Sequence, residues 1–156
     1  MARPDPLLEI LARDTYLGFD FGNKKIGVAV GQLTTGSASP LCTIRAIRQQ
    51  PDWHKLARLI ADWQPSGLVV GISRQADGSA NPITPRMLKF CRQLQGRYRL
   101  PVHQIDEALT TFEAKQMLFD EVGVNAAKLW EVQDQLAAQL ILQSWINEQT
   151  SEHDRS

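Results

Sequence analysis

The sequence has only two cysteines, Cys42 and Cys91, which form neither the spacing of a zinc site nor a disulfide framework. We therefore expect both thiols to be reduced. No segment approaches the ~20 consecutive apolar residues that a membrane helix needs. The N-terminus lacks the pattern of a signal peptide. Together these absences favour a cytoplasmic protein.

Two common catalytic arrangements are missing as well. No Gly-x-x-x-x-Gly-Lys phosphate loop occurs, which argues against a P-loop nucleotide hydrolase. The histidines are His54 on an expected helix, His103 on an expected strand and His153 in a polar tail. A Ser-His-Asp triad is therefore not expected.

Acidic residues are absent from two long stretches, although the 156-residue chain has 17 basic and 17 acidic residues and no net charge. The basic residues are Lys24, Lys25, Arg45 and Arg48 in residues 21–51, and Arg86, Lys89, Arg92, Arg97 and Arg99 in residues 78–105. Zero net charge argues against a strong general binder of nucleic acid. The two basic stretches nevertheless favour local attraction of a polyanion. The alternative is that they are solvated faces balanced by acids elsewhere in the fold.

The most informative stretch is residues 16–31, where two short apolar runs flank a Gly-Asn-Lys-Lys turn. This pattern predicts a β-hairpin. Bulky and small residues alternate in each run, so each strand has one bulky face and one small face. Asp20 lies on the small face, where a carboxylate needs protein donors, a cation or water as partners. The alternative is a hydrogen-bonded Asp20 that closes the hairpin.

The remaining patterns predict strands and helices in alternation. Apolar residues recur at the spacing of a helix or form short runs typical of buried strands. The elements expected after the hairpin are strands over 41–47, 68–72 and 102–106, and helices over 51–64, 83–97 and 131–147. A meander followed by βαβ-like units predicts an α/β fold, with one mixed sheet and helices on both faces. We expect a single domain over 1–156, with a lead-in over 1–14 and a disordered tail over 148–156.

Two further carboxylates are candidates to join Asp20. Asp134 precedes apolar residues at helical spacing, which places it on or near the apolar stripe of the last helix. Small alanines follow it, so this helix can pack on the small face of the hairpin with Asp134 facing Asp20. Either Asp106 or Glu107 ends the last strand, where catalytic groups of open α/β sheets collect.

Clustered carboxylates repel one another, and a divalent cation resolves that repulsion. Ligand sets made only of oxygen suit Mg²⁺ or Mn²⁺. The alternative for Asp134 is a position in the first turn of its helix, where it would favour the helix dipole. Thr110 and Glu113 have the spacing of a capping box, which gives them a structural role.

Four segments resemble motifs of the YqgF family, the Holliday-junction-resolvase-like candidate pre-16S rRNA nucleases. They are DFGNKKIGVAV (20–30), VVG with DGS (69–71 and 77–79), DEALTTFEA (106–114) and DQLAAQLIL (134–142). The resemblance implies an RNase H-like fold with a five-stranded mixed sheet. It also implies that Asp20, Glu107 and Asp134 hold Mg²⁺ or Mn²⁺ for phosphodiester hydrolysis, and it selects Glu107 over Asp106. The implied substrate is the 5′ end of pre-16S rRNA, with branched DNA as the alternative.

We expect phosphate contacts from Lys24, Lys25, Arg74 and Arg86, bordering the carboxylates. The chain departs from the family pattern at Ala108, where the family usually has Arg. It has Ile-Ser-Arg over 72–74 in place of Leu-Pro-Leu, and the connector before Asp134 is less basic than usual. We expect Arg74 to replace the missing arginine at position 108.

Two rival functions remain. The Asp-x-Gly hairpin also resembles the first phosphate loop of actin-like ATPases and sugar kinases, but those proteins need two such halves and this chain supplies one. The stronger rival is a non-catalytic module that binds RNA or a ribosomal precursor particle and keeps its acids for folding. The absence of a basic residue at position 108 favours this rival. Metal-dependent cleavage by the purified protein separates it from a nuclease.

Overall fold

The structure, a computed structural model, describes residues 14–48, 50–75, 79, 81–107 and 126–154. The predicted lead-in before residue 14, the capping box at Thr110 and Glu113, and Ala108 lie outside these residues. Within the described part of the chain, no helix is long and apolar enough to cross a membrane.

A six-stranded mixed sheet forms the centre of the molecule, in the order β4-β3-β2-β1-β5-β6. Its strands are β1 (Thr15–Phe21), β2 (Lys25–Gln32), β3 (Ser37–Ile47), β4 (Gln50–Pro51), β5 (Gly67–Ile72) and β6 (Val102–Asp106). The first four pair antiparallel in succession, and β5 and β6 continue the sheet in parallel beyond β1. The mixed α/β sheet confirms the predicted class. The expected count of five strands misses β4, because two residues carry no periodic pattern.

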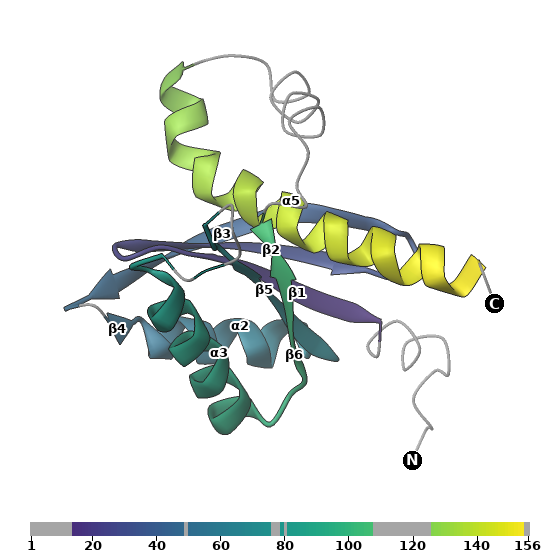
Figure 1. Ribbon diagram of the computed structural model, residues 1–156, viewed down its shortest axis with the longest axis horizontal. Coiled ribbons are helices and arrows are strands. Elements are labelled where there is room, and N and C mark those ends of the chain that lie inside the picture. The colour runs from purple at the N-terminus through teal and green to yellow at the C-terminus, as the bar shows by residue number, and fades with distance from the viewer. Residues whose placement is uncertain (1–13, 49, 76–78, 80, 108–125, 155–156) are drawn as a thin grey trace.

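Helices cover both faces of the sheet, as Figure 1 shows. The bulky face of the hairpin, which includes Leu17, Phe19 and Ile26, is buried against α2 (Trp53–Trp63) and α3 (Thr84–Tyr98). The small face packs against α5 (Ala126–Asp154). The alternation of bulky and small residues along β1 and β2 therefore decides which helix packs on which face.

The loop after β5 is tied to the start of α3 by polar side chains. Asn81 Oδ1 accepts hydrogen bonds from the backbone amides of Ile83 (3.1 Å) and Thr84 (3.2 Å). The buried Thr84 hydroxyl donates to the carbonyl of Ser73 at 2.6 Å. These bonds satisfy backbone donors that the first turn of a helix leaves unpaired. They also fix the backbone next to Arg74.

A row of glutamines anchors α5 to β3 and the turn before it. Gln135, Gln139 and Gln143 follow one another at four-residue spacing, which places them on one side of the helix. Their Nε2 atoms donate, in that order, to Thr43 Oγ1 (3.2 Å), the Ala38 carbonyl (2.9 Å) and the Gly36 carbonyl (2.9 Å). Three bonds along the helix resist sliding and rotation, so they also fix the position of Asp134.

The final helix extends beyond the predicted 131–147 at both ends. The expectation of a disordered tail over 148–156 is therefore wrong as far as Asp154. Glu148, Gln149 and Glu152 are good helix formers, and the Thr150 hydroxyl donates back to the Ile146 carbonyl at 3.2 Å. The polar residues of this segment therefore belong to the exposed end of a helix.

Candidate functional site

Asp20 lies at the end of β1 on the face that α5 covers, and it is half-buried. Its partner across the hairpin is Gly27. A Cβ atom on Gly27 would collide with the backbone of Asp134 and lie 3.0 Å from the Asp134 Cβ. The glycine thus lets α5 approach the strand closely enough to bring Asp134 beside Asp20.

Asp134 is not a residue of the first helical turn. Because α5 begins at Ala126, Asp134 lies well inside the helix, and the interpretation based on the helix dipole is wrong. The residue is half-buried and lines a hollow of about 380 Å³ beside the hairpin turn. Its location is set by packing against Gly27.

Glu107 follows β6 directly and lies over β5. A Cβ atom on Gly71 of β5 would meet the Glu107 Cγ at 3.1 Å and collide with Ile141 of α5. Glu107 is therefore on the α5 face, and its Oε1 atom is buried. Asp106 is exposed, and as the adjacent residue in an extended strand it points to the other face. Glu107 thus lies on the same face of the sheet as Asp20, and its role as a ligand stays a prediction.

The three carboxylates gather at one end of the sheet. Asp20 follows Phe19, which pairs with Val70 of β5, so it lies at the level of Gly71 and hence near Glu107. Asp134 approaches from the other side, over β2. In the described residues, however, no group of three or more His, Cys, Asp or Glu could hold a metal ion as it stands. The acids are neighbours rather than an assembled ligand set.

The chemistry of these residues nevertheless fits a divalent cation. All three are carboxylates, the ligand type that Mg²⁺ and Mn²⁺ prefer. Carboxylates that share a site repel one another, and a bound divalent cation offsets that repulsion. The residues that would hold the ion are Asp20, Glu107 and Asp134.

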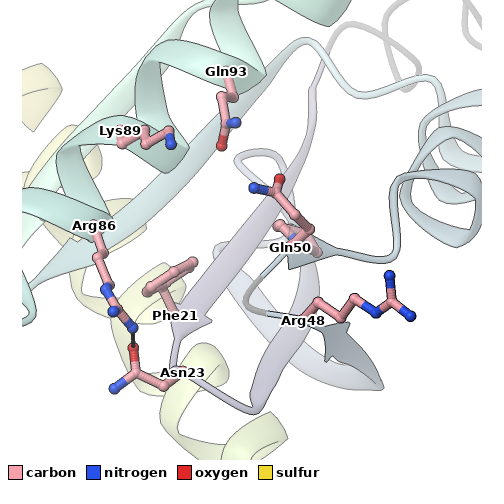
Figure 2. Close-up of a pocket in the computed structure, with 8 residues that line it drawn as sticks. Phe21, Asn23, Arg48, Gln50, Arg86, Lys89 and Gln93 are labelled. Atoms are coloured by element: carbon pink, nitrogen blue, oxygen red, sulfur yellow. Dashed lines mark hydrogen bonds between the residues drawn. The ribbon is translucent and has the colours of Figure 1, made fainter.

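The four residues predicted to contact phosphate lie in three different places. Lys24 and Lys25 are exposed and line the same hollow as Asp134. Arg86 lines a second hollow of about 150 Å³ on the α3 side of the hairpin turn, where its Nη1 donates to Asn23 Oδ1 at 2.8 Å (Figure 2). Arg74 is exposed and belongs to the lining of neither hollow.

The second hollow contains basic residues that the sequence did not single out as site residues. Arg48 comes from the turn between β3 and β4, and Lys89 from α3. The feature of the sequence that could have indicated these residues is the absence of acidic residues from two long stretches. Arg48 belongs to the first acid-free stretch, and Arg86 and Lys89 to the second. The fold brings these two stretches together.

The opposite end of the α5 face is aromatic. The ring centroids of Tyr16 and His103 lie 4.7 and 4.9 Å from that of Trp145. Burial lowers the pKa of His103, which favours its neutral form. Burial raises the pKa of the Cys91 thiol to about 11. Neither group is placed to act at the carboxylates.

A mixed sheet with one acid near the end of its central strand β1, one directly after the edge strand β6 and one on the last helix is typical of RNase H-like folds. The chain is similar in fold to T. thermophilus RuvC in complex with a Holliday junction substrate, with a TM-score of 0.55 and 16% identity over 88% of this chain and 97% of that one. The chain belongs to the RuvX family, whose model, described as Holliday junction resolvase, matches residues 14–148. This confirms the resemblance seen in the four motifs.

Relatives from several bacteria carry the name "Putative pre-16S rRNA nuclease". The chain is 53% identical over 133 residues to the one from Methylococcus capsulatus, covering 85% of this chain and 88% of the relative. It is 46% identical over 134 residues to the one from Pseudomonas putida, covering 86% and 95%. Both alignments cover most of each chain.

Proposed function

We propose that the protein is a divalent-metal-dependent endonuclease that cleaves nucleic acid phosphodiesters in the cytoplasm, at the 5′ end of pre-16S rRNA. The observation that supports the proposal is that Asp20, Glu107 and Asp134 all lie on the α5 side of the sheet, with Asp134 lining a hollow together with Lys24 and Lys25. The names of the relatives support the choice of substrate, with branched DNA as the alternative.

Asp20, Glu107 and Asp134 would hold Mg²⁺ or Mn²⁺, which supplies an activated water and stabilises charge at the reacting phosphate. The chain itself supplies the negative charge that binds the cation and the rigid backbone that orients the ligands. Lys24 and Lys25 attract and position the phosphodiester, since contacts to phosphate set the register of a bound strand. No histidine is required as a base, which agrees with the location of His103 at the other end of the sheet.

A second candidate is a module that binds RNA or a ribosomal precursor particle without cleaving it. The observation in its favour is that the described residues hold no group of side chains already arranged for a metal. The two candidates share the basic surface, and they differ in whether the acids act in chemistry.

The test is cleavage by purified wild type, Asp20→Asn and Asp106→Asn, each with Mg²⁺, Mn²⁺ or EDTA. The substrates are an RNA that spans the 5′ end of 16S rRNA and a four-way DNA junction. Asp106→Asn is the matched control, because it removes an exposed acid next to the proposed ligands. We expect metal-dependent cleavage by wild type and Asp106→Asn, and none by Asp20→Asn. Equal cleavage by all three would contradict the proposal, and RNA binding without cleavage by any would favour the module.

A further inference from the structure

A pocket of about 150 Å³ lies between the hairpin turn, the β3–β4 turn and α3, and we call it the α3 pocket. The polar residues that line it are Asn23, Arg48, Gln50, Arg86, Lys89 and Gln93. We propose that the α3 pocket binds a backbone phosphate of the same nucleic acid strand, a few nucleotides from the bond that is cleaved. This inference rests on the proposed function, because it names a second contact of the same substrate.

The lining of the pocket has the chemistry of an anion site. Three side chains, Arg48, Arg86 and Lys89, carry positive charge, and none of the described lining residues is acidic. The amides of Gln50 and Gln93 add neutral donors. Arginine and lysine together with amide donors are the groups that proteins direct at phosphates.

The pocket has an apolar wall. The Phe21 ring lines the pocket and packs on Phe90 of α3, with ring centroids 5.1 Å apart. Lys89 and Gln93 are four residues apart on α3, so both lie on the same side of that helix. Figure 2 shows Arg86 extended toward Asn23, which accepts its hydrogen bond. Much of the pocket is therefore held in place before a ligand binds.

Arg48 occupies an unusual backbone position at the rim. Its φ of 52° is in the left-handed region, which favours glycine or asparagine. The adjacent residue Ile47 pairs with Gln50, so this tight turn places Arg48 and Gln50 together beside the pocket. Figure 2 shows the Arg48 side chain extending away from Arg86 and Lys89, and it is exposed, so a passing strand can meet it.

Asn23 links the α3 pocket to the carboxylates, because it lines both hollows. The other hollow contains Lys24, Lys25 and Asp134. A residue spans at most about 3.6 Å, so the Cα of Asn23 lies within about 11 Å of the Cα of Asp20. A strand that crosses the hairpin turn therefore passes from the acids to the α3 pocket within a few nucleotides.

The volume of the α3 pocket indicates which part of a nucleic acid strand fits into it. Sites for whole small molecules enclose roughly 300–1,000 Å³, and a water takes about 30 Å³ of liquid. The α3 pocket, at about 150 Å³, has room for a phosphate group with a few waters and is too small for a nucleotide. The structure thus favours a phosphate contact, which carries no sequence preference of its own.

The test compares Arg48→Gln/Lys89→Gln with the control Arg58→Gln/Arg92→Gln, which removes two exposed charges outside both hollows. Binding of a 20-nucleotide single-stranded RNA is measured by fluorescence anisotropy in EDTA, from 50 to 200 mM salt. Two lost phosphate contacts should reduce the slope of log K against log salt by about 1.4. Between 50 and 200 mM salt, the affinity of wild type should then fall by a factor about seven times larger than the factor by which the affinity of the pocket variant falls. Melting temperatures show whether each variant is folded.

A second measurement uses inorganic phosphate alone. Titration should shift the side-chain amide NMR signals of Asn23 and Gln93 in wild type and in the control, and not in the pocket variant. Equal salt slopes in the two double variants, with these signals unmoved, would overturn the inference even if wild type cleaves RNA. A selective loss of slope in the pocket variant, with no cleavage by wild type, would support the inference and contradict the nuclease proposal.

Discussion

The backbone of Asp134 rests directly on Gly27, in the space that any larger residue would need for its Cβ atom. Gly27 is in turn the cross-strand partner of Asp20. One contact therefore docks the last helix on the sheet and brings two of the three acids together. Stability and the candidate site depend on the same glycine.

Gly27→Ala should destabilise the protein, because the added Cβ forces the α5 backbone away from β2. Overpacking of this kind costs about 1–3 kcal/mol, and a backbone neighbour that cannot move favours the upper end. Gly96→Ala is the matched control. That helical glycine has nothing within 4 Å of its added Cβ, so the change should stabilise by about 0.5–1 kcal/mol. Urea unfolding measures both, and equal effects would contradict the docking described.

Lys24→Ala/Lys25→Ala should weaken the binding of RNA of any sequence, since both lysines line the hollow beside Asp134. If each lysine neutralises one phosphate of a duplex region, the slope of log K against log salt should flatten by roughly one unit per residue, and by about 0.7 per residue on a single strand. Anisotropy titrations over a range of salt concentrations measure the slope, with Arg58→Gln/Arg92→Gln as the charge-matched control. An unchanged slope would mean that the two lysines only solvate the turn.

Much of the fold follows from periodicity alone. Residues 102–106 are predicted as a strand and form β6 with those bounds, and the alternation in residues 16–31 correctly assigns one bulky and one small face. The sequence could not predict β4, which pairs because the β3–β4 turn folds Gln50 back onto Ile47. The prediction of a disordered tail was wrong for residues 148–154, which are helical. Polar composition alone does not distinguish an exposed helix end from a disordered tail.

The positions of two candidate ligands could be predicted from the sequence, because each is a carboxylate in an unusual setting. Asp20 and Asp134 each stood out as a carboxylate among small or apolar residues. The α3 pocket was not predictable, because its basic side chains come from the β3–β4 turn and α3, which are far apart in sequence. Which basic residues meet depends on strand order, and only the folded chain shows it.

Low pH should destabilise the protein in part through His103. Burial against Tyr16 and Trp145 lowers its pKa below the usual 6.5, so the unfolded chain binds more protons between the two pKa values. The resulting loss of stability begins as pH falls through the unfolded value. Urea midpoints at pH 8 and pH 5.5 should therefore differ less in His103→Gln than in wild type. The same reduction in the control His54→Gln, an exposed position, would contradict this assignment.

Mn²⁺ should raise the melting temperature of the wild type, because a ligand that binds only the folded state stabilises it by mass action. At 100 times its dissociation constant the gain is about 2.7 kcal/mol. Asp20→Asn should lose most of this gain. Without metal it should be at least as stable as wild type, because one source of repulsion among the acids is removed. Asp106→Asn is the control, and it should respond to Mn²⁺ as wild type does.

The most direct measurement is a crystal structure of the protein soaked in Mn²⁺, with the ion located by its anomalous scattering. We predict Mn²⁺ at the end of the sheet, with oxygens of Asp20, Glu107 and Asp134 about 2–2.6 Å from an ion. Mn²⁺ bound elsewhere, or bound without Asp134, would contradict the claim that the three carboxylates form one metal site.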